Sequence, residues 1–375
     1  MNERALIGPL TRSLLIAAGA DAPGALDRAL DLGVDATLYR LRPHPSHAHV
    51  WRGHLADTLA RRRLLSELRE RLDRIGVEAV VLKGEPLARR LFQDPFARRS
   101  GDIDLLVALE DARPAGDELR AGGFSPMYRA RPEPWISDEW SFVHGTTRQV
   151  VELHWAIASP YLPSPPARDL IERSVVPPWS DGVPVLSPED CGLNLMLHFH
   201  HHAGFFKGLV DVAAWLDTHE EHEVVGTLDR ARALGLLGVA SWPLRALERL
   251  TPYAPPLEIS SSPIPRLFGE LTARASRGVL ARDEPLEGAH PLSFKTRGMS
   301  RAQTTAWHCA CASLLDEPSA AIRAIVWPIT RDPASLALAA GRDRPDLIDW
   351  AHFALRPALL AGRALSDLTR EGDHP

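Results

Sequence analysis

The spacing of hydrophobic residues changes along the chain. Over residues 1–75 leucines recur every three or four positions, and between Leu55 and Leu72 arginines lie on the opposite side of the repeat. This spacing is typical of amphipathic helices, and Gly76 is a suitable residue for ending one. Residues 1–75 are therefore predicted to be a helical N-terminal region.

After Gly76 the repeat shortens and β-branched residues become common, which is typical of short strands. Strands are predicted at 77–82, 102–107, 141–143 and 149–157, with a turn at 145–147, and short helices at 86–92 and 111–122. Residues 76–158 are thus expected to form a small sheet with helices packed against it.

Eight prolines fall within residues 159–190, which predicts a connecting arm. Ser187 to Asp190 then supply an N-cap, a proline and two acids, the pattern of a helix start. Further helices are predicted up to about residue 250 and, after a proline- and serine-rich break at 252–265, over 266–280, 301–326 and 345–369. Residues 191–375 are predicted to form a helical C-terminal region. The predicted class is α+β, a small mixed sheet embedded in helical N- and C-terminal regions.

The composition is that of an ordinary globular protein, with 45% hydrophobic and 24% charged residues among 375. A net charge of −5 gives no overall basic field, so no long nucleic acid is expected as a partner. Three cysteines argue against a disulfide framework. No signal peptide or membrane-spanning run is found, and we expect a cytoplasmic protein without a membrane partner.

The clearest candidate chemistry lies in the strand at 102–107. Asp102 and Asp104 are two positions apart, so both side chains are expected on one face of the sheet. Two neighbouring carboxylates repel each other, and a bound cation removes that repulsion. Glu152 is a third acid, within the apolar strand at 149–157. Three carboxylates on neighbouring strands suit Mg²⁺ or Mn²⁺, in a two-metal site for phosphoryl displacement.

A second interpretation needs no metal. Asp102 and Asp104 would mark the end of a strand and pair with Arg98 or Arg99, while Glu152 would face solvent on a half-exposed strand. Arg98 would then be a surface charge or a partner of Asp94. Exposed pairs of this kind are common and contribute little to stability.

As a set, three motifs resemble a known family. They are Leu82-Lys83-Gly84 with Arg98, Gly101 to Val107 with its paired aspartates, and Glu152 to Trp155. Together they are similar to the DNA polymerase β-type nucleotidyltransferase superfamily, and more narrowly to the bacterial group called uncharacterised nucleotidyltransferase. The resemblance covers about residues 50–220.

The resemblance implies that a nucleoside monophosphate is transferred from an NTP, with ATP the expected donor, and that pyrophosphate is released. It implies Asp102, Asp104 and Glu152 as metal ligands and catalytic residues. The superfamily's usual Gly-Ser turn is replaced here by Lys83-Gly84-Glu85. Residues expected to contact the nucleotide are Lys83, Gly84, Arg98, Gly101, Lys207 and Asp211.

Other polar groups have weaker patterns. Lys207 and Asp211 are four apart on a predicted helix, where a surface ion pair is the alternative to a contact with the nucleotide. His198 and His202 share a helix face, which favours a polar lining of the cleft over a zinc site. Arg61 to Arg63 are assigned to a solvated helix face, and Cys309 and Cys311 to buried small residues.

The sequence therefore predicts a Mg²⁺-dependent nucleotidyltransferase. Its acceptor is an unidentified small molecule, peptide, protein side chain or RNA end. The alternative is a catalytically inactive nucleotide-binding or antitoxin-like interaction module on the same fold. The replaced Gly-Ser turn favours this alternative, whereas the three acids count against it.

Overall fold

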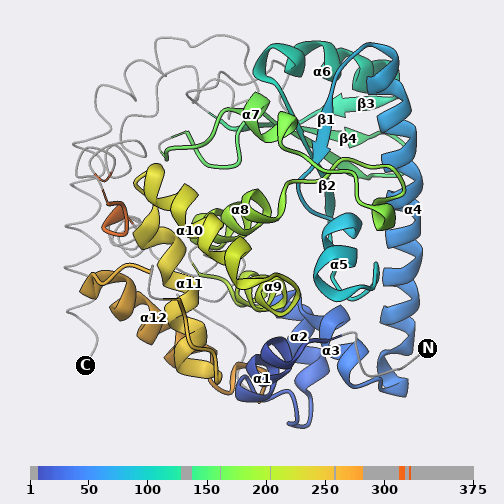
Figure 1. The fold of residues 1–375 in the computed structure, drawn as a ribbon. Coiled ribbons are helices and arrows are strands. Elements are labelled where there is room, and N and C mark those ends of the chain that lie inside the picture. The colour runs from blue at the N-terminus through green and yellow to red at the C-terminus, as the bar shows by residue number, and fades with distance from the viewer. Residues whose placement is uncertain are drawn as a thin grey trace, which may run out of the picture.

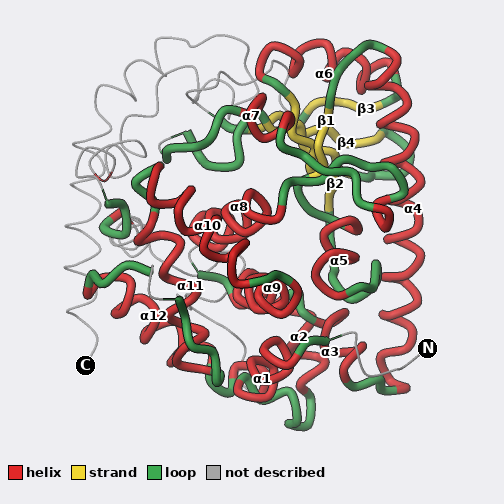
Figure 2. The backbone as a smooth tube through the Cα atoms, viewed as in Figure 1, coloured by secondary structure: helices red, strands yellow, loops and turns green. Residues whose placement is uncertain are grey.

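The computed structural model describes residues 7–127, 137–160, 162–202, 204–256, 259–281, 312–316 and 321 (Figure 1). Within them, a mixed sheet lies at one end of the molecule and most of the helices lie below and beside it (Figures 1 and 2). The predicted α+β class is confirmed. None of the helices described is both long and apolar enough to cross a membrane.

The sheet has five strands in the order β1-β2-β5-β4-β3. The strands are β1 Ala79–Val81, β2 Asp102–Val107, β3 Phe124–Pro126, β4 Glu139–His144 and β5 Val150–His154. β2 and β5 are parallel and form the centre, while every other neighbouring pair is antiparallel. The central parallel pair brings together the two strands on which the sequence places its carboxylates.

The helices fall into two groups along the chain. Those before or between the strands are α1 Pro9–Ala17, α2 Ala25–Leu32, α3 Asp35–Leu41, α4 Ala48–Arg74, α5 Glu85–Phe92 and α6 Ala112–Ala121. Those after the sheet are α7 Ala167–Glu172, α8 Pro188–His201, α9 Phe206–Thr218, α10 Glu221–Ala233, α11 Leu237–Leu250 and α12 Pro263–Ser276. Short 3₁₀ turns occur at Pro45–His47, Leu109–Asp111, Pro178–Ser180 and Val279–Ala281. The long helix α4 runs beside the sheet and down to the N-terminal helices (Figure 1).

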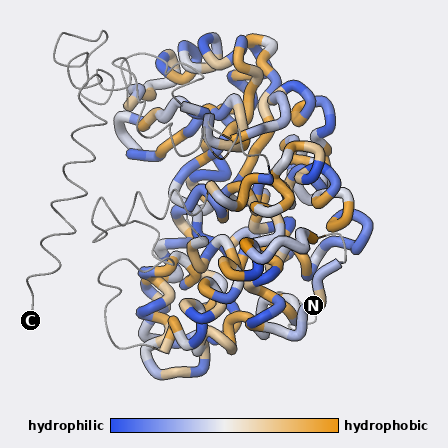
Figure 3. Tube along the Cα trace, turned by 90° about the vertical axis from the view of Figure 1, so that its left-hand side faces the viewer, coloured by the Kyte–Doolittle hydropathy of each residue, from blue (hydrophilic) through white to orange (hydrophobic). Residues whose placement is uncertain are grey.

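The two faces of the sheet pack against different partners. Ile103, Leu105 and Val107 of β2 lie in one apolar cluster with residues of α4 and α6. Leu106 points to the other face, where it joins a second cluster that includes α1, α5, α8, α9 and α11. Hydrophobic and hydrophilic segments alternate along most helices, as this packing requires (Figure 3). Asp102 and Asp104, which alternate with Ile103 and Leu105, therefore lie on the same face of the sheet as Leu106.

Most predicted elements agree with the structure. The strand at Asp102–Val107 has the predicted bounds, and the strand expected at 77–82 is shorter, at Ala79–Val81. Ser187 caps α8 by accepting a hydrogen bond from the Asp190 backbone, as predicted. The strand β3 was not predicted, since three residues give too little alternation. Except for residues 312–316 and 321, the helices expected at 301–326 and 345–369, with Cys309 and Cys311, lie outside the described residues.

The proline-rich segment 159–190 contains more structure than an extended arm. It includes α7, and Val185 forms β-bridges with both Val175 and Val81. The Val81 amide donates to the Pro184 carbonyl over 3.0 Å, so this segment runs along the edge of β1. The division into regions at residues 75, 158 and 190 stays a prediction.

Candidate active site

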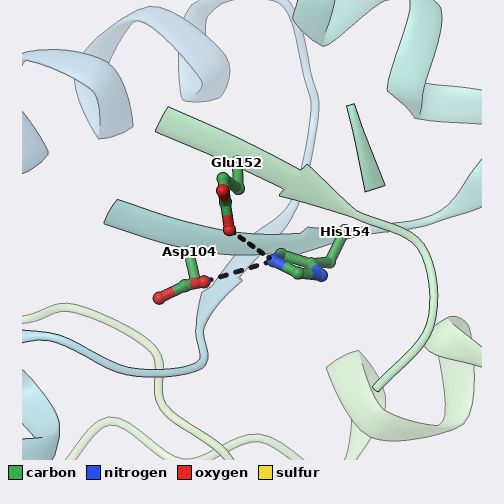
Figure 4. Close-up of side chains that lie close together, drawn as sticks. All are labelled: Asp104, Glu152 and His154. Carbon is green, nitrogen blue, oxygen red and sulfur yellow. Dashed lines mark hydrogen bonds and ion pairs between the residues drawn. The ribbon is translucent and has the colours of Figure 1, made fainter. Parts of the chain in front are cut away.

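The parallel pairing of β2 and β5 places two of the three predicted carboxylates opposite each other. Asp104 and Glu152 are partners in the register, and His154 follows two residues later on the same face. Asp104 and Glu152 both point toward the His154 ring (Figure 4). Ligand atoms of these three residues lie within 4.8 Å of one another. The sheet therefore gathers a group that can ligate a metal.

Asp104 is the most buried member of this group, with no exposed surface. Its Oδ1 accepts hydrogen bonds from Lys83 Nζ over 3.1 Å and from His154 Nε2 over 3.2 Å. Its Oδ2 is buried and has no hydrogen-bond partner. A buried carboxylate oxygen without a partner is costly, and a cation bound to it would remove that cost. This orphaned oxygen, on a residue whose register partner is Glu152, fits a hard divalent cation such as Mg²⁺ or Mn²⁺.

The charges around Asp104 shift its pKa and those of its partners. Burial alone raises the pKa of Asp104, but the Lys83 ammonium and the His154 ring together hold it well below its ordinary value. Burial alone lowers the pKa of His154, but Asp104 and Glu152 raise it to about 10. Likewise, the two aspartates outweigh burial and raise the pKa of Lys83. Asp104 is therefore ionised between two cations at neutral pH.

Asp102 lies at the first position of β2, at the edge of the group. Its carboxylate does not join Asp104, Glu152 and His154 within the 4.8 Å that unites them. Burial, Asp104 and Glu152 raise its pKa, because each disfavours a further negative charge. The ionised form of Asp102 is thus unfavourable here, and a cation shared with Asp104 would stabilise it.

Arg98 pairs with Asp211 rather than with the acids suggested by the second interpretation. Its Nε and Nη2 donate to the two Asp211 oxygens over 2.8 and 2.9 Å, and both side chains are nearly inaccessible to solvent. Asp94 instead pairs with Arg40, and Arg99 with Asp35. The surface-charge interpretation of Arg98 is therefore wrong.

Lys207 and Asp211 do not form the surface pair that their spacing allows. Lys207 Nζ donates to the Arg99 carbonyl over 2.7 Å, while Asp211 is occupied by Arg98. Burial and the nearby Arg98 lower the pKa of Lys207 to about 7. Two residues of α9 thus contact the loop that leads into β2. Gly101, at the end of this loop, is exposed.

The end of α8 carries a compact group of aromatic rings. The His198 and His202 rings are 4.4 Å apart, and both lie about 5 Å from Phe205 in edge-to-face contacts. Burial and the charge of Lys83 lower the pKa of His198, and burial with His201 lowers that of His202 to about 3. These imidazoles are neutral at neutral pH and lie near enough to Lys83 for its charge to affect their pKa values, and their place in a cleft lining stays a prediction.

A pocket opens beside Asp102. It is lined by Thr58, Arg61, Arg62, Leu65, Val81, Lys83, Gly84, Glu85, Pro86, Arg98, Ser100, Asp102 and Ile103. Gly84 forms the turn into α5 with φ 80° and ψ −146°, a conformation open essentially to glycine. Of the three arginines assigned to a solvated helix face, Arg62 and Arg63 are exposed, whereas Arg61 is half-buried in this lining.

Residues 42–250, more than half of the chain, match the family described as uncharacterised nucleotidyltransferase. The chain belongs to this family. The matched segment contains β1 to β5, α4 and α9, and therefore every residue of the site described above. Membership of a nucleotidyltransferase family supports a transferase. None of the curated proteins compared with the chain matches it.

Sequence reasoning missed two residues of this candidate site. His154 Nε2 lies 3.6 Å from oxygens of both Glu152 and Glu139, in addition to its contact with Asp104. Glu139 is the register partner of His154 on β4, and burial raises its pKa to about 7. The spacing of Glu152 and His154 could have revealed the histidine, because positions i and i+2 of a strand share a face. The place of Glu139 beside His154 depends on the pairing of β4 with β5, which no local sequence pattern predicts.

Proposed function

We propose that the protein is a Mg²⁺- or Mn²⁺-dependent nucleotidyltransferase. It transfers a nucleoside monophosphate from an NTP, with ATP the expected donor, to a hydroxyl or similar group and releases pyrophosphate. The observation that carries this proposal is the buried, partnerless Oδ2 of Asp104, next to Glu152 on a parallel strand. A dead site would have little reason to keep such a costly arrangement.

Asp102, Asp104 and Glu152 are the catalytic carboxylates in this proposal. They would hold the cations, with Asp102 and Asp104 on one strand and Glu152 on the next. When bound, the cations supply charge neutralisation at the phosphates and acidify the attacking hydroxyl. Glu152 is half-buried at the site, so its free oxygen is placed to accept a proton from that hydroxyl.

The pocket beside Asp102 is the proposed donor site. Four basic side chains and two acidic ones line it, a balance that favours a polyphosphate. Lys83 is held beside Asp104, where its ammonium can stabilise charge that develops on the transferred phosphate. Gly84 allows the backbone to turn closely there, and Arg98 adds a fixed positive charge.

The acceptor is proposed to approach from the side of β5 and β4. A small molecule, a peptide, a protein side chain and an RNA end all offer a suitable nucleophile. The net charge of −5 disfavours a long nucleic acid. We propose a cytoplasmic location, where ATP and Mg²⁺ are available.

The second candidate is a catalytically inactive module that binds a nucleotide or a partner on this fold. The observation that favours it is the replacement of the Gly-Ser turn by Lys83-Gly84-Glu85. The side chain of Glu85 lines the pocket and brings a negative charge where phosphate would bind. Such a module would bind its ligand without depending on Asp104 or on a divalent cation.

Thermal unfolding with each NTP, with and without Mg²⁺, tests the proposal. We expect one NTP to raise the midpoint only when Mg²⁺ is present, with a stabilisation of about 2.7 kcal/mol at 100 times its dissociation constant. The shift should disappear in Asp104→Asn and in Glu152→Gln. A shift that survives both substitutions and needs no cation would support the inactive module. No shift with any NTP in the folded wild type would contradict the proposed donor site.

A further inference from the structure

The lining of the pocket raises a question that the motifs leave open, namely which side chain binds the terminal phosphates. Four basic residues line it: Arg61, Arg62, Lys83 and Arg98. A cation that already has a close carboxylate partner offers less to an incoming phosphate, because that pair must be weakened or broken. The partner of each basic residue therefore identifies the group that is free to bind.

Three of these cations are already paired. Lys83 Nζ lies 3.1 Å from Asp104, and Arg98 makes its two-bond contact with Asp211. Arg62 pairs with Asp181, which also receives Arg89. Arg98 in particular is buried, and its Nε and Nη2 both donate to Asp211, so it acts as a fixed charge rather than as a flexible ligand.

Arg61 is different. Among the described residues it forms no ion pair and no hydrogen bond, although its side chain is half-buried in the pocket wall. Burial lowers its pKa, and the carboxylates of Asp57 and Asp102 partly restore it, which places the guanidinium in the field of Asp102. An unpaired, partly desolvated guanidinium is well suited to bind phosphate in two-bond geometry.

The position of Arg61 agrees with this role. Helix α4 packs against both α5 and β2, the two elements that border the pocket. Asp102, the turn at Gly84 and Arg61 of α4 all line this pocket, so a donor with its α-phosphate at Asp102 has α4 among the walls that its outer phosphates can contact. Glu85, the one other acid in the lining, pairs with Arg89 and is thereby partly neutralised.

We propose that Arg61 binds the terminal phosphates of the donor and makes the pocket selective for nucleoside triphosphates over monophosphates. This inference rests on the proposed function for the identity of the ligand. In this proposal a residue of α4, the helix before the sheet, makes the phosphate contact that a Gly-Ser turn would otherwise provide.

Calorimetric titration of the full chain with ATP, AMP and inorganic tripolyphosphate, each with Mg²⁺, tests the proposal. We expect Arg61→Gln to weaken ATP and tripolyphosphate binding by roughly tenfold or more, as for the loss of a charge-assisted hydrogen bond, and to leave AMP binding within about twofold. Arg63→Gln is the matched control, because Arg63 is exposed on the same helix, pairs with Glu67 and lies outside the pocket.

The outcomes separate the two proposals. If Arg61→Gln binds ATP as tightly as the control, or loses ATP and AMP equally, the role of Arg61 is wrong. If ATP binding also needs Asp104 and Mg²⁺ in that case, the proposed function stands alone. If wild type binds tripolyphosphate through Arg61 but no NTP, the phosphate site stands and the proposed function fails. Binding of neither compound by the folded wild type contradicts both proposals.

Discussion

Arg98 and Asp211 are joined by two hydrogen bonds of 2.8 and 2.9 Å across 113 residues of sequence. One residue lies in the loop before β2 and the other in α9, and both are almost fully buried. The pair thus holds the loop before β2 against α9, one of the helices that follow the sheet. Because Lys207 of α9 also binds the Arg99 carbonyl, the loop is held at two successive residues.

Removing one partner of this pair should be costly. We predict that Asp211→Ala lowers the free energy of unfolding by about 3–5 kcal/mol, because it leaves the Arg98 guanidinium buried without compensation. Urea denaturation measures the difference. Asp117→Ala, which breaks the exposed pair of Asp117 with Arg120 on α6, is the control and should change stability by less than about 0.5 kcal/mol. Equal effects of the two substitutions would contradict the structural role of Arg98 and Asp211.

Gly84 and Gly53 should respond to alanine in opposite directions. At Gly84 a Cβ has room, since its nearest neighbour would be Ser100 Oγ at 3.9 Å, but φ is +80° and ψ −146°. We predict that Gly84→Ala destabilises by about 1–3 kcal/mol through backbone strain alone. Gly53 lies within α4 with open space around it, so Gly53→Ala should stabilise by about 0.5–1 kcal/mol. Denaturation midpoints that move in the same direction would refute this explanation.

Asp102 should oppose stability when no cation is present. Its raised pKa means that the folded state favours the protonated acid over the carboxylate. The stability that the protonated Asp102 contributes is therefore lost as the pH rises above about 4. We predict that Asp102→Asn raises the unfolding midpoint at pH 7.5, by an amount on the order of 1–3 °C. The same variant should lose the stabilisation by NTP and Mg²⁺. A lower midpoint in the absence of metal would show that the carboxylate supports the fold instead.

His202 gives a prediction for acid conditions. Its pKa is about 3 in the fold against an ordinary 6.5, so the unfolded chain binds more protons between these values. The stabilisation is therefore complete above pH 6.5 and decreases as the pH falls toward 3. Between pH 7 and pH 5 we predict that wild type loses up to about 2 kcal/mol more than His202→Asn. Chemical denaturation at both pH values measures this difference, and identical losses would contradict a neutral, half-buried His202.

Much of the fold could be predicted because local patterns agree with it. Asp102–Val107 combines β-branched and aliphatic residues with the alternation of a buried strand, and Ser187 provides a cap with a proline after it. β3 escaped prediction because its three residues carry no period. The strand order, with β5 inserted between β2 and β4, depends on contacts distant in sequence.

The candidate site could also be predicted only in part. The motifs pointed to Asp102, Asp104 and Glu152, and the parallel register of β2 with β5 makes Asp104 and Glu152 neighbours. The partner of Arg98 could not be predicted, because Asp211 lies on a helix whose orientation depends on the whole core. The pocket lining could not be predicted for a related reason: arginines 61 to 63 look alike in sequence, and only the packing of α4 places Arg61 and Arg62, but not Arg63, in the pocket wall.

Mn²⁺ binding followed by electron paramagnetic resonance shows whether Asp104 and Glu152 hold metal ions, since Mn²⁺ can replace Mg²⁺ at oxygen ligands. With a non-hydrolysable ATP analogue, we expect about two protein-bound Mn²⁺ per chain, as for a two-metal site. Asp104→Asn should lose both, and Glu152→Gln, which leaves the contacts of Asp104 with Lys83 intact, should lose at least one. Folded variants that bind Mn²⁺ and the analogue as the wild type does would contradict the claim that these carboxylates form the metal site.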